Sequence, residues 1–393
     1  MERIPFHVPT VDELDIAAVL ETLRSGWITT GPKNRAFEAA FGEMLGDGFH
    51  CVAVNSCTAA LHLAVEAVGL GPGDLAITTP FTFTATAEVL RYVGADPLFV
   101  DIDPETLRLE PRDVRACIEA LDPERRRRLK AILPVHYGGN PCAMEGFEGL
   151  GEEFELSILD DAAHALPSRR KGRLIGAWGD VSSFSFYATK TLCTGEGGMA
   201  VTRDARLADR MRVMRLHGIS HDVFDRYQSN TPGWYYEIVA PGYKYNLGDI
   251  AAALGLSQLP RIESFRALRQ SIAERYDAGF ASVEALRVPP APDAGDQHAW
   301  HLYPLRVAGG REYRDRVIEE LSRLEIATSV HFIPLHLQPY WRDRYEFTPS
   351  DFPAASELFA QEISLPIFPS MTDAQVARVI AGVREALDTA RRD

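Results

Sequence analysis

Cysteine is scarce in this sequence, and its spacing excludes two classes of site. The chain of 393 residues contains five cysteines, an odd number with no close pair at the spacing of metal ligands. They are Cys51, Cys57, Cys117, Cys142 and Cys193. We therefore expect neither a disulfide framework nor a zinc or other metal site.

Two further absences concern membranes and nucleic acids. No stretch approaches the roughly 20 apolar residues that span a bilayer, and Met1 to Thr10 lacks the basic-then-apolar pattern of a secretory signal. We therefore expect a cytoplasmic protein without a membrane partner. The formal net charge of −14 argues against a nucleic-acid partner. The basic run Arg125 to Arg128 with Lys130 is interpreted as a solvated helix end, with an anion-binding patch as the alternative.

The first half of the chain alternates short apolar runs with helix-like segments. This pattern is typical of βαβ units and predicts an α/β fold with a mostly parallel, seven-stranded sheet. Helices such as Thr58–Val68 and Thr84–Val93 lie between several of the strands. The predicted strands are Cys51–Val54, Leu75–Thr78, Pro97–Val100, Lys130–Pro134, Leu156–Leu159, Val181–Phe184 and Met199–Val201. Ligands bind such sheets at the carboxyl ends of the strands, so we expect the functional residues there.

The sequence pattern changes in the last third of the chain. The whole chain of 393 residues is longer than a domain with a single core usually is, which favours a second domain. We expect one long helix over Asp249–Ala278, followed by a smaller C-terminal α+β domain. Its predicted parts are the strand-like His301–Val307, the helical Tyr313–Leu324, the apolar Thr328–Phe332 and the terminal helix Asp373–Ala390. The predicted division is 1–248 for the large domain, 249–288 for the linking helix and 289–393 for the small domain, with the boundary near Pro289–Asp296.

Two segments that follow predicted strands offer polar groups at the same sheet edge. Asn55 to Ala60 opens a helix whose first backbone N–H groups suit a phosphate, although a simple cap by Ser56 or Thr58 is the alternative. Asp160 to Ala165 places two carboxylates and an imidazole after another strand. One carboxylate there could hold a buried cation, whereas a helix cap and a core histidine are the plainer interpretation.

A single lysine is the third candidate group that follows a predicted strand. Lys190 follows an apolar strand and precedes Gly195-Glu196-Gly197-Gly198. Most lysines are surface residues, but a lysine shielded from water becomes a nucleophile toward carbonyls. We call the helix start at Asn55 to Ala60 the anion cradle. Pyridoxal phosphate requires such a cradle for its phosphate, a strand-end aspartate for its ring nitrogen and a sheltered lysine for its aldehyde, and the sequence offers them in this order.

Seven motifs, spread over nearly the whole chain, resemble those of the DegT-type sugar aminotransferases, which have the type I (aspartate-aminotransferase) fold of pyridoxal-phosphate enzymes. They are Ser25 to Pro32, Thr79 to Phe83, Pro134 to Gly139, Asp161 to His164, Ser185 to Lys190 with the glycine-rich turn, Gly242 to Leu247 and Ser364 to Pro366. Within the family, the first motif, Tyr243 to Asn246 and His298 to Leu302 look most like the branch that makes UDP-4-amino-4-deoxy-L-arabinose with glutamate and oxoglutarate.

This resemblance implies roles for individual residues. Lys190 would bind the cofactor covalently, Asp161 would pair with the ring nitrogen, and His164 would lie near the ring hydroxyl. The implied cofactor contacts are completed by Cys57, Thr58, Phe83, Ser185 and, from the neighbouring subunit, Asn246. The implied substrate contacts are Trp27, Thr30, Tyr187 and His331. Cys57 stands where the family usually has Gly or Ala, which crowds the cradle.

The resemblance also implies an activity. An amino group would pass from L-glutamate, leaving 2-oxoglutarate, to the keto carbon, C4, of a nucleotide-linked sugar, in a homodimer with shared active sites. A C3-keto-sugar or cyclitol aminotransferase is the alternative enzyme, because the run His331 to His336 departs from the pentose branch. A non-catalytic, cofactor-binding regulator is the alternative from another class. The related dehydratases carry histidine in place of Lys190, so a dehydratase is disfavoured.

Overall fold

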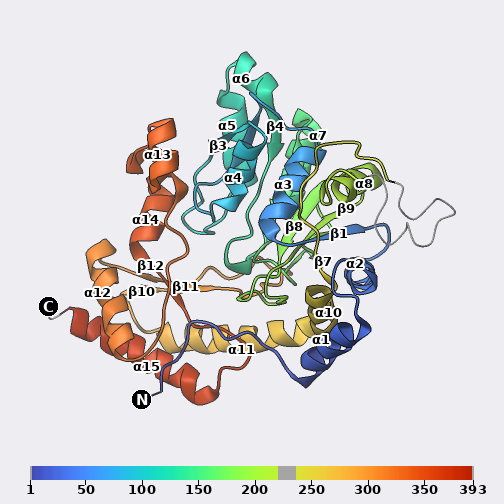
Figure 1. The fold of residues 1–393 in the computed structure, drawn as a ribbon. Coiled ribbons are helices and arrows are strands. Elements are labelled where there is room, and N and C mark those ends of the chain that lie inside the picture. Colours follow the sequence, from blue (N-terminus) through green and yellow to red (C-terminus); the bar gives the residue numbers. More distant parts are fainter. Residues whose placement is uncertain (1, 220–235, 392–393) are drawn as a thin grey trace.

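Seven of the apolar segments form one sheet at the centre of the molecule (Figure 1). The computed structural model describes residues 2–219 and 236–391. The strand order is β1-β9-β8-β5-β4-β2-β3, and β9 runs antiparallel to both of its neighbours while the other pairs are parallel. The strands are β1 (His50–Val54), β2 (Leu75–Thr78), β3 (Asp96–Phe99), β4 (Leu129–Ile132), β5 (Ser157–Asp161), β8 (Val181–Ser185) and β9 (Gly198–Thr202). The predicted mostly parallel, seven-stranded sheet is confirmed, and only strand ends differ.

Helices cover both faces of this sheet and bury it. One face packs against α3 (Cys57–Ala67), α4 (Ala85–Tyr92) and α8 (Ala205–Met214), and the other against α2 (Pro32–Leu45) and α7 (Met144–Phe154). The remaining helices of this part are α1 (Glu13–Ser25), α5 (Pro111–Ala120), α6 (Pro123–Arg128) and α10 (Asp249–Gln258). Every residue of β8 and β9 is buried, as expected for strands covered on both faces.

The basic run forms the last turn of α6, where Arg125, Arg126 and Arg127 are exposed. The interpretation of this run as a solvated helix end is confirmed. In the described residues, no helix combines the length and the apolar character needed to cross a bilayer.

A second, smaller sheet lies beside the first and has its own apolar core (Figure 1). It is antiparallel, in the order β10-β11-β12, with helices packed against it, which agrees with the predicted α+β character. Its elements are β10 (Leu286–Arg287), β11 (Tyr303–Val307), β12 (Glu362–Leu365), α11 (Ile262–Phe280), α12 (Gly310–Arg323), α13 (Pro339–Tyr345), α14 (Pro353–Gln361) and α15 (Asp373–Ala390). A two-stranded ribbon, β6 (Arg169–Arg170) with β7 (Arg173–Leu174), completes the strands of the described residues. The residue numbers of the domain boundaries stay a prediction.

Two expectations for the C-terminal part are corrected. The single helix over Asp249–Ala278 is wrong, because the 3₁₀ turn Leu259–Arg261 separates α10 from α11. Pro260 lies in this turn and has no N–H for a helical hydrogen bond, which explains the break. The segment His301–Val307 is strand only from Tyr303 onward, and His301 instead faces a cavity. The terminal helix has the predicted bounds, with Thr372 as its cap.

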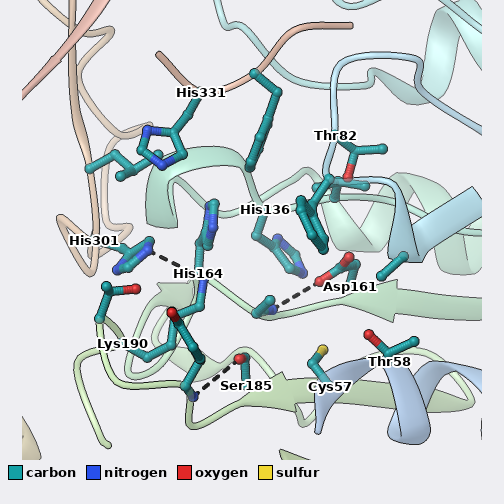
Figure 2. Close-up of a pocket in the computed structure, with 18 of the residues that line it drawn as sticks. Cys57, Thr58, Thr82, His136, Asp161, His164, Ser185, Lys190, His301 and His331 are labelled. Carbon is teal, nitrogen blue, oxygen red and sulfur yellow. Dashed lines mark hydrogen bonds between the residues drawn. The ribbon is translucent and has the colours of Figure 1, made fainter. Parts of the chain in front are cut away.

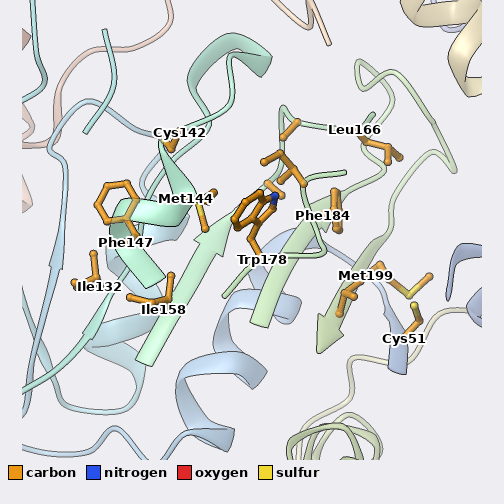
Figure 3. Close-up of a cluster of buried hydrophobic side chains, with 14 of the residues drawn as sticks. Cys51, Ile132, Cys142, Met144, Phe147, Ile158, Leu166, Trp178, Phe184 and Met199 are labelled. Atoms are coloured by element: carbon orange, nitrogen blue, oxygen red, sulfur yellow. The ribbon is translucent and has the colours of Figure 1, made fainter. Parts of the chain in front are cut away.

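The core between the large sheet and α2 depends on aromatic packing (Figure 3). Phe184 of β8 is fully buried, and its ring centroid lies 5.2 Å from that of Phe41 in α2. Gly176, at φ 105°, approaches the same ring so closely that an added Cβ would lie 2.8 Å from its Cζ. This contact fixes β8 against the helical layer and so positions the residues at the carboxyl end of β8.

Replacement of Phe184 by alanine tests this core. We expect Phe184→Ala to lower the free energy of unfolding by about 3–5 kcal/mol, because it removes a buried ring and leaves a cavity. Leu268→Ala, at a position 48% exposed on α11, should change it by less than about 0.5 kcal/mol. Urea-induced unfolding of both variants measures the difference, and equal midpoints would contradict the assigned role of this cluster.

Candidate active site

The described residues enclose a cavity of about 630 Å³ at the carboxyl ends of β5 and β8. Its wall combines the large sheet, the segment before β11 and residues near the chain start, including Phe6 and His7. Figure 2 shows Lys190, His301 and His331 on one side of this cavity and Asp161, Cys57 and Thr58 on the other. A volume of this size suits small-molecule sites, which measure about 300–1,000 Å³. Among the described residues that line it, Lys190 is the only lysine or arginine.

Asp161 presents its carboxylate to this cavity. It is the last residue of β5 and is buried, and Oδ2 accepts a hydrogen bond from Thr86 Oγ1 at 2.7 Å. Oδ1 accepts a second bond from the backbone N–H of Ala163 at 3.0 Å. Burial raises the pKa of this carboxyl, while the two hydrogen bonds and the charge of Lys190 oppose the rise. The carboxylate is therefore fixed in direction and sensitive to any positive charge placed beside it.

The neighbouring Asp160 points to the opposite face of the sheet. Its Oδ1 accepts a hydrogen bond from Ser182 Oγ at 2.6 Å, and Oδ2 lies 3.2 Å from His136 Nε2. His136 Nδ1 in turn accepts a bond from the backbone N–H of Cys142 at 3.0 Å. Because Nδ1 is an acceptor, the ring proton is on Nε2 and is donated to Asp160. The sequence offered two carboxylates, and the structure aims one of them into the cavity.

Lys190 follows β8 in a tight turn. Its backbone N–H donates to the carbonyl oxygen of Tyr187 at 2.8 Å, and its Nζ lies 3.3 Å from His301 Nε2. Burial lowers the pKa of this lysine from its usual value near 10.5 to about 8. More of this side chain is therefore a neutral, nucleophilic amine near neutral pH than is the case for a surface lysine.

The N-terminus of α3 provides an anion cradle at the lower edge of the cavity. Ser56 caps the helix, its Oγ accepting from the N–H of Ala59 at 3.1 Å, while Cys57 and Thr58 line the cavity. First-turn amides have no partner within their own helix and can bind a phosphate. The close approach of β9 requires glycine, because a Cβ on Gly198 would lie 2.6 Å from the backbone of Ser56. The helix cap by Ser56 and the anion cradle at the start of α3 are thus both present.

Two side chains border this cradle. The Cys57 thiol donates to the carbonyl oxygen of Ser183 at 3.4 Å, and burial raises its pKa well above the usual range. It therefore stays protonated and turns toward β8. The Oγ of Ser185 accepts from the N–H of Tyr187 at 3.4 Å, which leaves its own hydrogen to be donated into the cavity.

Histidines and a phenylalanine form the other wall. His164 Nδ1 accepts from the N–H of Gly138 at 3.3 Å, and its ring lies 4.3 Å from that of His301 and stacks on Phe332 at 5.9 Å. His331 Nδ1 lies 2.9 Å from Ser364 Oγ. Burial lowers the pKa of His164 well below 6.5 and that of His331 to about 4. These imidazoles are neutral hydrogen-bonding groups rather than cations.

Phe83 and Tyr187 also line the cavity, and both are exposed. Phe83 is 59% exposed although it is a large apolar ring, so it is available to a ligand or to a second chain.

Three of the expected residues lie outside this chain's own cavity. Asn246 Nδ2 donates to Thr30 Oγ1 at 2.6 Å, and Trp27 Nε1 donates to the carbonyl oxygen of Thr30 at 3.1 Å. None of the three lines the cavity. The structure thus gathers Trp27, Thr30 and Asn246 into a group of their own.

No role was assigned from the sequence to Thr86, which bonds to Asp161, or to Phe6, His7 and His301, which line the cavity. Thr86 had no signal, because a threonine in a helix is usually a packing residue. Phe6 and His7 lie in an extended segment without a motif. His301 was visible in the run His298 to Leu302, but was assigned to a strand.

The groups present fit pyridoxal phosphate. A partly buried amine suits its aldehyde, a buried carboxylate suits its protonated ring nitrogen, and free amides at a helix N-terminus suit its phosphate. The observation that Gly198 admits no Cβ beside Ser56 shows that the backbone is packed tightly around this cradle.

Comparison with known proteins agrees with this geometry. The pattern of the DegT/DnrJ/EryC1/StrS aminotransferase family matches residues 9–384. The chain is 44% identical to the spore coat polysaccharide biosynthesis protein SpsC of Bacillus subtilis (strain 168) over 385 residues, which cover 97% of this chain and 96% of SpsC.

Two solved structures share the fold. The aminotransferase TlmJ from Streptoalloteichus hindustanus superposes with a TM-score of 0.88 at 34% identity, covering 98% of this chain and 99% of TlmJ. The PLP form of Spr1654 from Streptococcus pneumoniae superposes with a TM-score of 0.88 at 32% identity, covering 99% of each chain. Pyridoxal phosphate is the cofactor of these enzymes. The chain belongs to the DegT/DnrJ/EryC1/StrS family of pyridoxal-phosphate-dependent aminotransferases.

Proposed function

We propose that the protein transfers an amino group from L-glutamate to the C4 keto carbon of a nucleotide-linked sugar. The observation that carries this proposal is the pair formed by Lys190 and Asp161, a partly buried amine and a buried carboxylate that open into one cavity. The name of SpsC, a polysaccharide biosynthesis protein, supports a carbohydrate substrate. The nucleotide and the C4 position rest on the resemblance of the sequence motifs to the branch that aminates a UDP-linked keto-pentose.

Lys190 has two tasks in this proposal. Its neutral Nζ would hold the cofactor through the aldehyde carbon of the cofactor and would be freed by the incoming amino donor. The freed amine would accept the proton from the α-carbon of the donor as a general base and would then donate it as a general acid. When bound, pyridoxal phosphate supplies the electron sink that makes this α-hydrogen acidic. A pKa of about 8 suits both tasks near neutral pH.

Asp161 has the task of keeping a positive charge on the ring nitrogen. Its carboxylate would accept the N–H of the pyridinium, and the low dielectric of a buried site would strengthen this pairing. Thr86 and Ala163 hold the two oxygens in a fixed direction. The backbone at Cys57 and Thr58, with the hydroxyl of Ser185, binds the phosphate. His164 remains neutral and donates or accepts one hydrogen bond at the ring hydroxyl.

The working unit in this proposal is a homodimer with shared sites. Asn246 bonds to Thr30 and lies away from its own cavity, so its side chain suits a neighbour's phosphate. Exposed apolar side chains such as Ile238 and Val239 lie close to it in the sequence and would be covered by a second chain. Trp27, Thr30, Tyr187 and His331 are proposed to contact the sugar nucleotide.

The substrate proposal is tested with purified protein, L-glutamate and a panel of UDP-, GDP- and dTDP-linked sugars with a ketone at C4 or C3, together with cyclitol ketones. Formation of 2-oxoglutarate together with an amino sugar only from the C4 ketones supports the proposal. Turnover of C3 ketones or cyclitol ketones alone contradicts it.

Lys190→Ala is expected to abolish turnover. Borohydride reduction of the wild-type protein with its cofactor should fix the label on the peptide that contains Lys190, and a label on another lysine would contradict the assignment. In the cofactor-free protein, the rate of covalent cofactor binding should rise with pH, with a midpoint near pH 8, and level off at higher pH, because the neutral amine predominates above its pKa.

Asp161→Asn is expected to lower the rate by about 10²- to 10⁴-fold without unfolding the protein, because the amide cannot hold a positive charge on the ring nitrogen. Asp160→Asn is the matched control. Its amide can still bond to Ser182 and His136, so its rate should stay within about tenfold of the wild-type rate. Steady-state rates measure the activity of both variants, and circular dichroism shows whether they are folded. A normal rate in Asp161→Asn would assign the pairing with the ring nitrogen to Asp160 instead.

Mixed dimers test the shared site. Lys190→Ala and Asn246→Asp chains, each inactive alone, should regain about a quarter of wild-type activity after refolding together, because half the dimers are mixed and each has one intact site. Mixing Lys190→Ala with Asp161→Asn should restore nothing, since both residues serve the site of their own chain. If subunit exchange is confirmed by mass and the first pair stays inactive, Asn246 does not serve the neighbour.

A further inference from the structure

The segment before β11 contains a strained turn. Trp300 has φ 51°, in the left-handed region, which is unfavourable for a bulky residue. Strain of this kind persists only where the surroundings over-determine the conformation, and it is often found at functional sites.

Three contacts hold Trp300 in this conformation. Its ring stacks on that of His298, with centroids 4.0 Å apart and planes 10° apart, and its backbone N–H donates to His298 Nδ1 at 2.7 Å. Its indole Nε1 donates to Gln270 Oε1 at 2.6 Å. The turn is thus held from both sides, by His298 in the same segment and by Gln270 in α11.

A buried arginine holds the end of the turn. Arg269 of α11 is 1% exposed, and its Nη1 donates to the carbonyl oxygens of Ile367 at 2.7 Å, Trp300 at 3.3 Å and His301 at 3.4 Å. A guanidinium fixed by three backbone acceptors allows the segment little freedom. The next side chain, His301, therefore has a defined direction.

That direction is toward Lys190 (Figure 2). His301 is buried, its Nε2 lies 3.3 Å from Lys190 Nζ, and its ring packs against His164. Its other nitrogen, Nδ1, has no hydrogen-bond partner among the described residues. In the described part of the chain, the hydrogen bond of His301 is thus to the proposed reactive amine.

We propose that His301 is a positioning residue for Lys190, whose Nε2 accepts a hydrogen bond from the lysine ammonium and holds Nζ at its place in the cavity. The inference rests on the proposed function, in which Lys190 is released and must then carry a proton between two carbon atoms. An ammonium group has only donors, so Nε2 must be the acceptor and the imidazole proton must be on Nδ1. His301 exchanges no proton with the substrate.

The charges around Lys190 agree with this arrangement. Burial, the dominant effect, and the charge of Arg269 lower the lysine pKa, whereas the carboxylate of Asp161 in β5 raises it. His164, His331 and His7 also face this region, and burial lowers the pKa of each of them, as it does for His301. His301 is therefore a neutral acceptor, and its bond favours the charged form of Lys190.

The titration of Lys190 tests the proposal without the cofactor. The full-length, cofactor-free protein is reductively methylated with formaldehyde and cyanoborohydride from about pH 6 to pH 10, and the Lys190 peptide is quantified by mass spectrometry. The wild-type midpoint is expected near pH 8. His301→Phe removes the acceptor, so the midpoint should fall by about one pH unit.

Two further variants separate positioning from packing. His301→Gln retains an acceptor and should restore the wild-type midpoint. His336→Phe is the matched control, because His336 is also buried and bonds to Ser356 outside the cavity, and its midpoint should equal that of the wild type. If His301→Phe does not fold, His301→Leu replaces it. An unchanged midpoint in the Phe or Leu variant, or no rescue by Gln, overturns the proposal.

The half-reaction with L-glutamate gives an independent measurement. In a single turnover, His301→Phe should be slower by about 10- to 100-fold at unchanged glutamate affinity, because misplacement of a catalytic group slows the reaction without affecting binding. His301→Gln should retain most of the rate. If the wild-type protein accepts an amino group from no donor, the proposed function fails, whereas the methylation midpoints still decide whether His301 binds Lys190.

Discussion

Successive side chains of a strand point to opposite faces of a sheet, and the chemistry of this site depends on that alternation at the ends of β5 and β8. In β5 it sends Asp160 toward Ser182 and the apolar core, and Asp161 toward α4 and the cavity. In β8 the same period turns Phe184 into the core and Ser185 into the cavity. A slip of one residue would turn Asp160 into the cavity in place of Asp161, without the hydrogen bonds from Thr86 and Ala163 that fix the carboxylate of Asp161.

Burial then determines what these groups can do. The described wall combines one lysine, the strand-end carboxylate of Asp161, the carboxylate of Glu196 and several imidazoles. Desolvation lowers the pKa of Lys190 and of the histidines and raises that of Asp161, so it favours neutral groups throughout. A bound cation would reverse this effect for Asp161. The same surroundings therefore keep an amine nucleophilic and keep a carboxylate ready to pair with a pyridinium.

The two sheets contribute differently to the cavity. The large sheet supplies Asp161, Ser185 and the cradle at α3 from regular elements, whereas the smaller part supplies His301 and His331 from irregular segments. Those segments are held by buried polar groups, such as Glu362, which accepts the N–H of His331 at 2.9 Å. Burial raises the pKa of Glu362 to about 8, so near neutral pH its carboxyl group is largely protonated and supports the segment through hydrogen bonds. Such hydrogen bonds fix the direction of side chains in irregular segments, which lack the regular backbone hydrogen bonds of a sheet.

The sequence by itself determined the seven strands, the terminal helix and three chemical groups at strand ends, because apolar periodicity and short motifs are local properties. It also indicated the family through motifs distributed over the chain. It could not choose between Asp160 and Asp161 from the residues alone, since that choice requires the register of β5 against its neighbours. It missed the break at Pro260 and the roles of Thr86, Phe6 and His301, because no local pattern reports on them. Only the tertiary structure brings Lys190 and His301 within 3.3 Å across 111 residues of chain, since long-range packing through Arg269 and Trp300 decides where the imidazole lies.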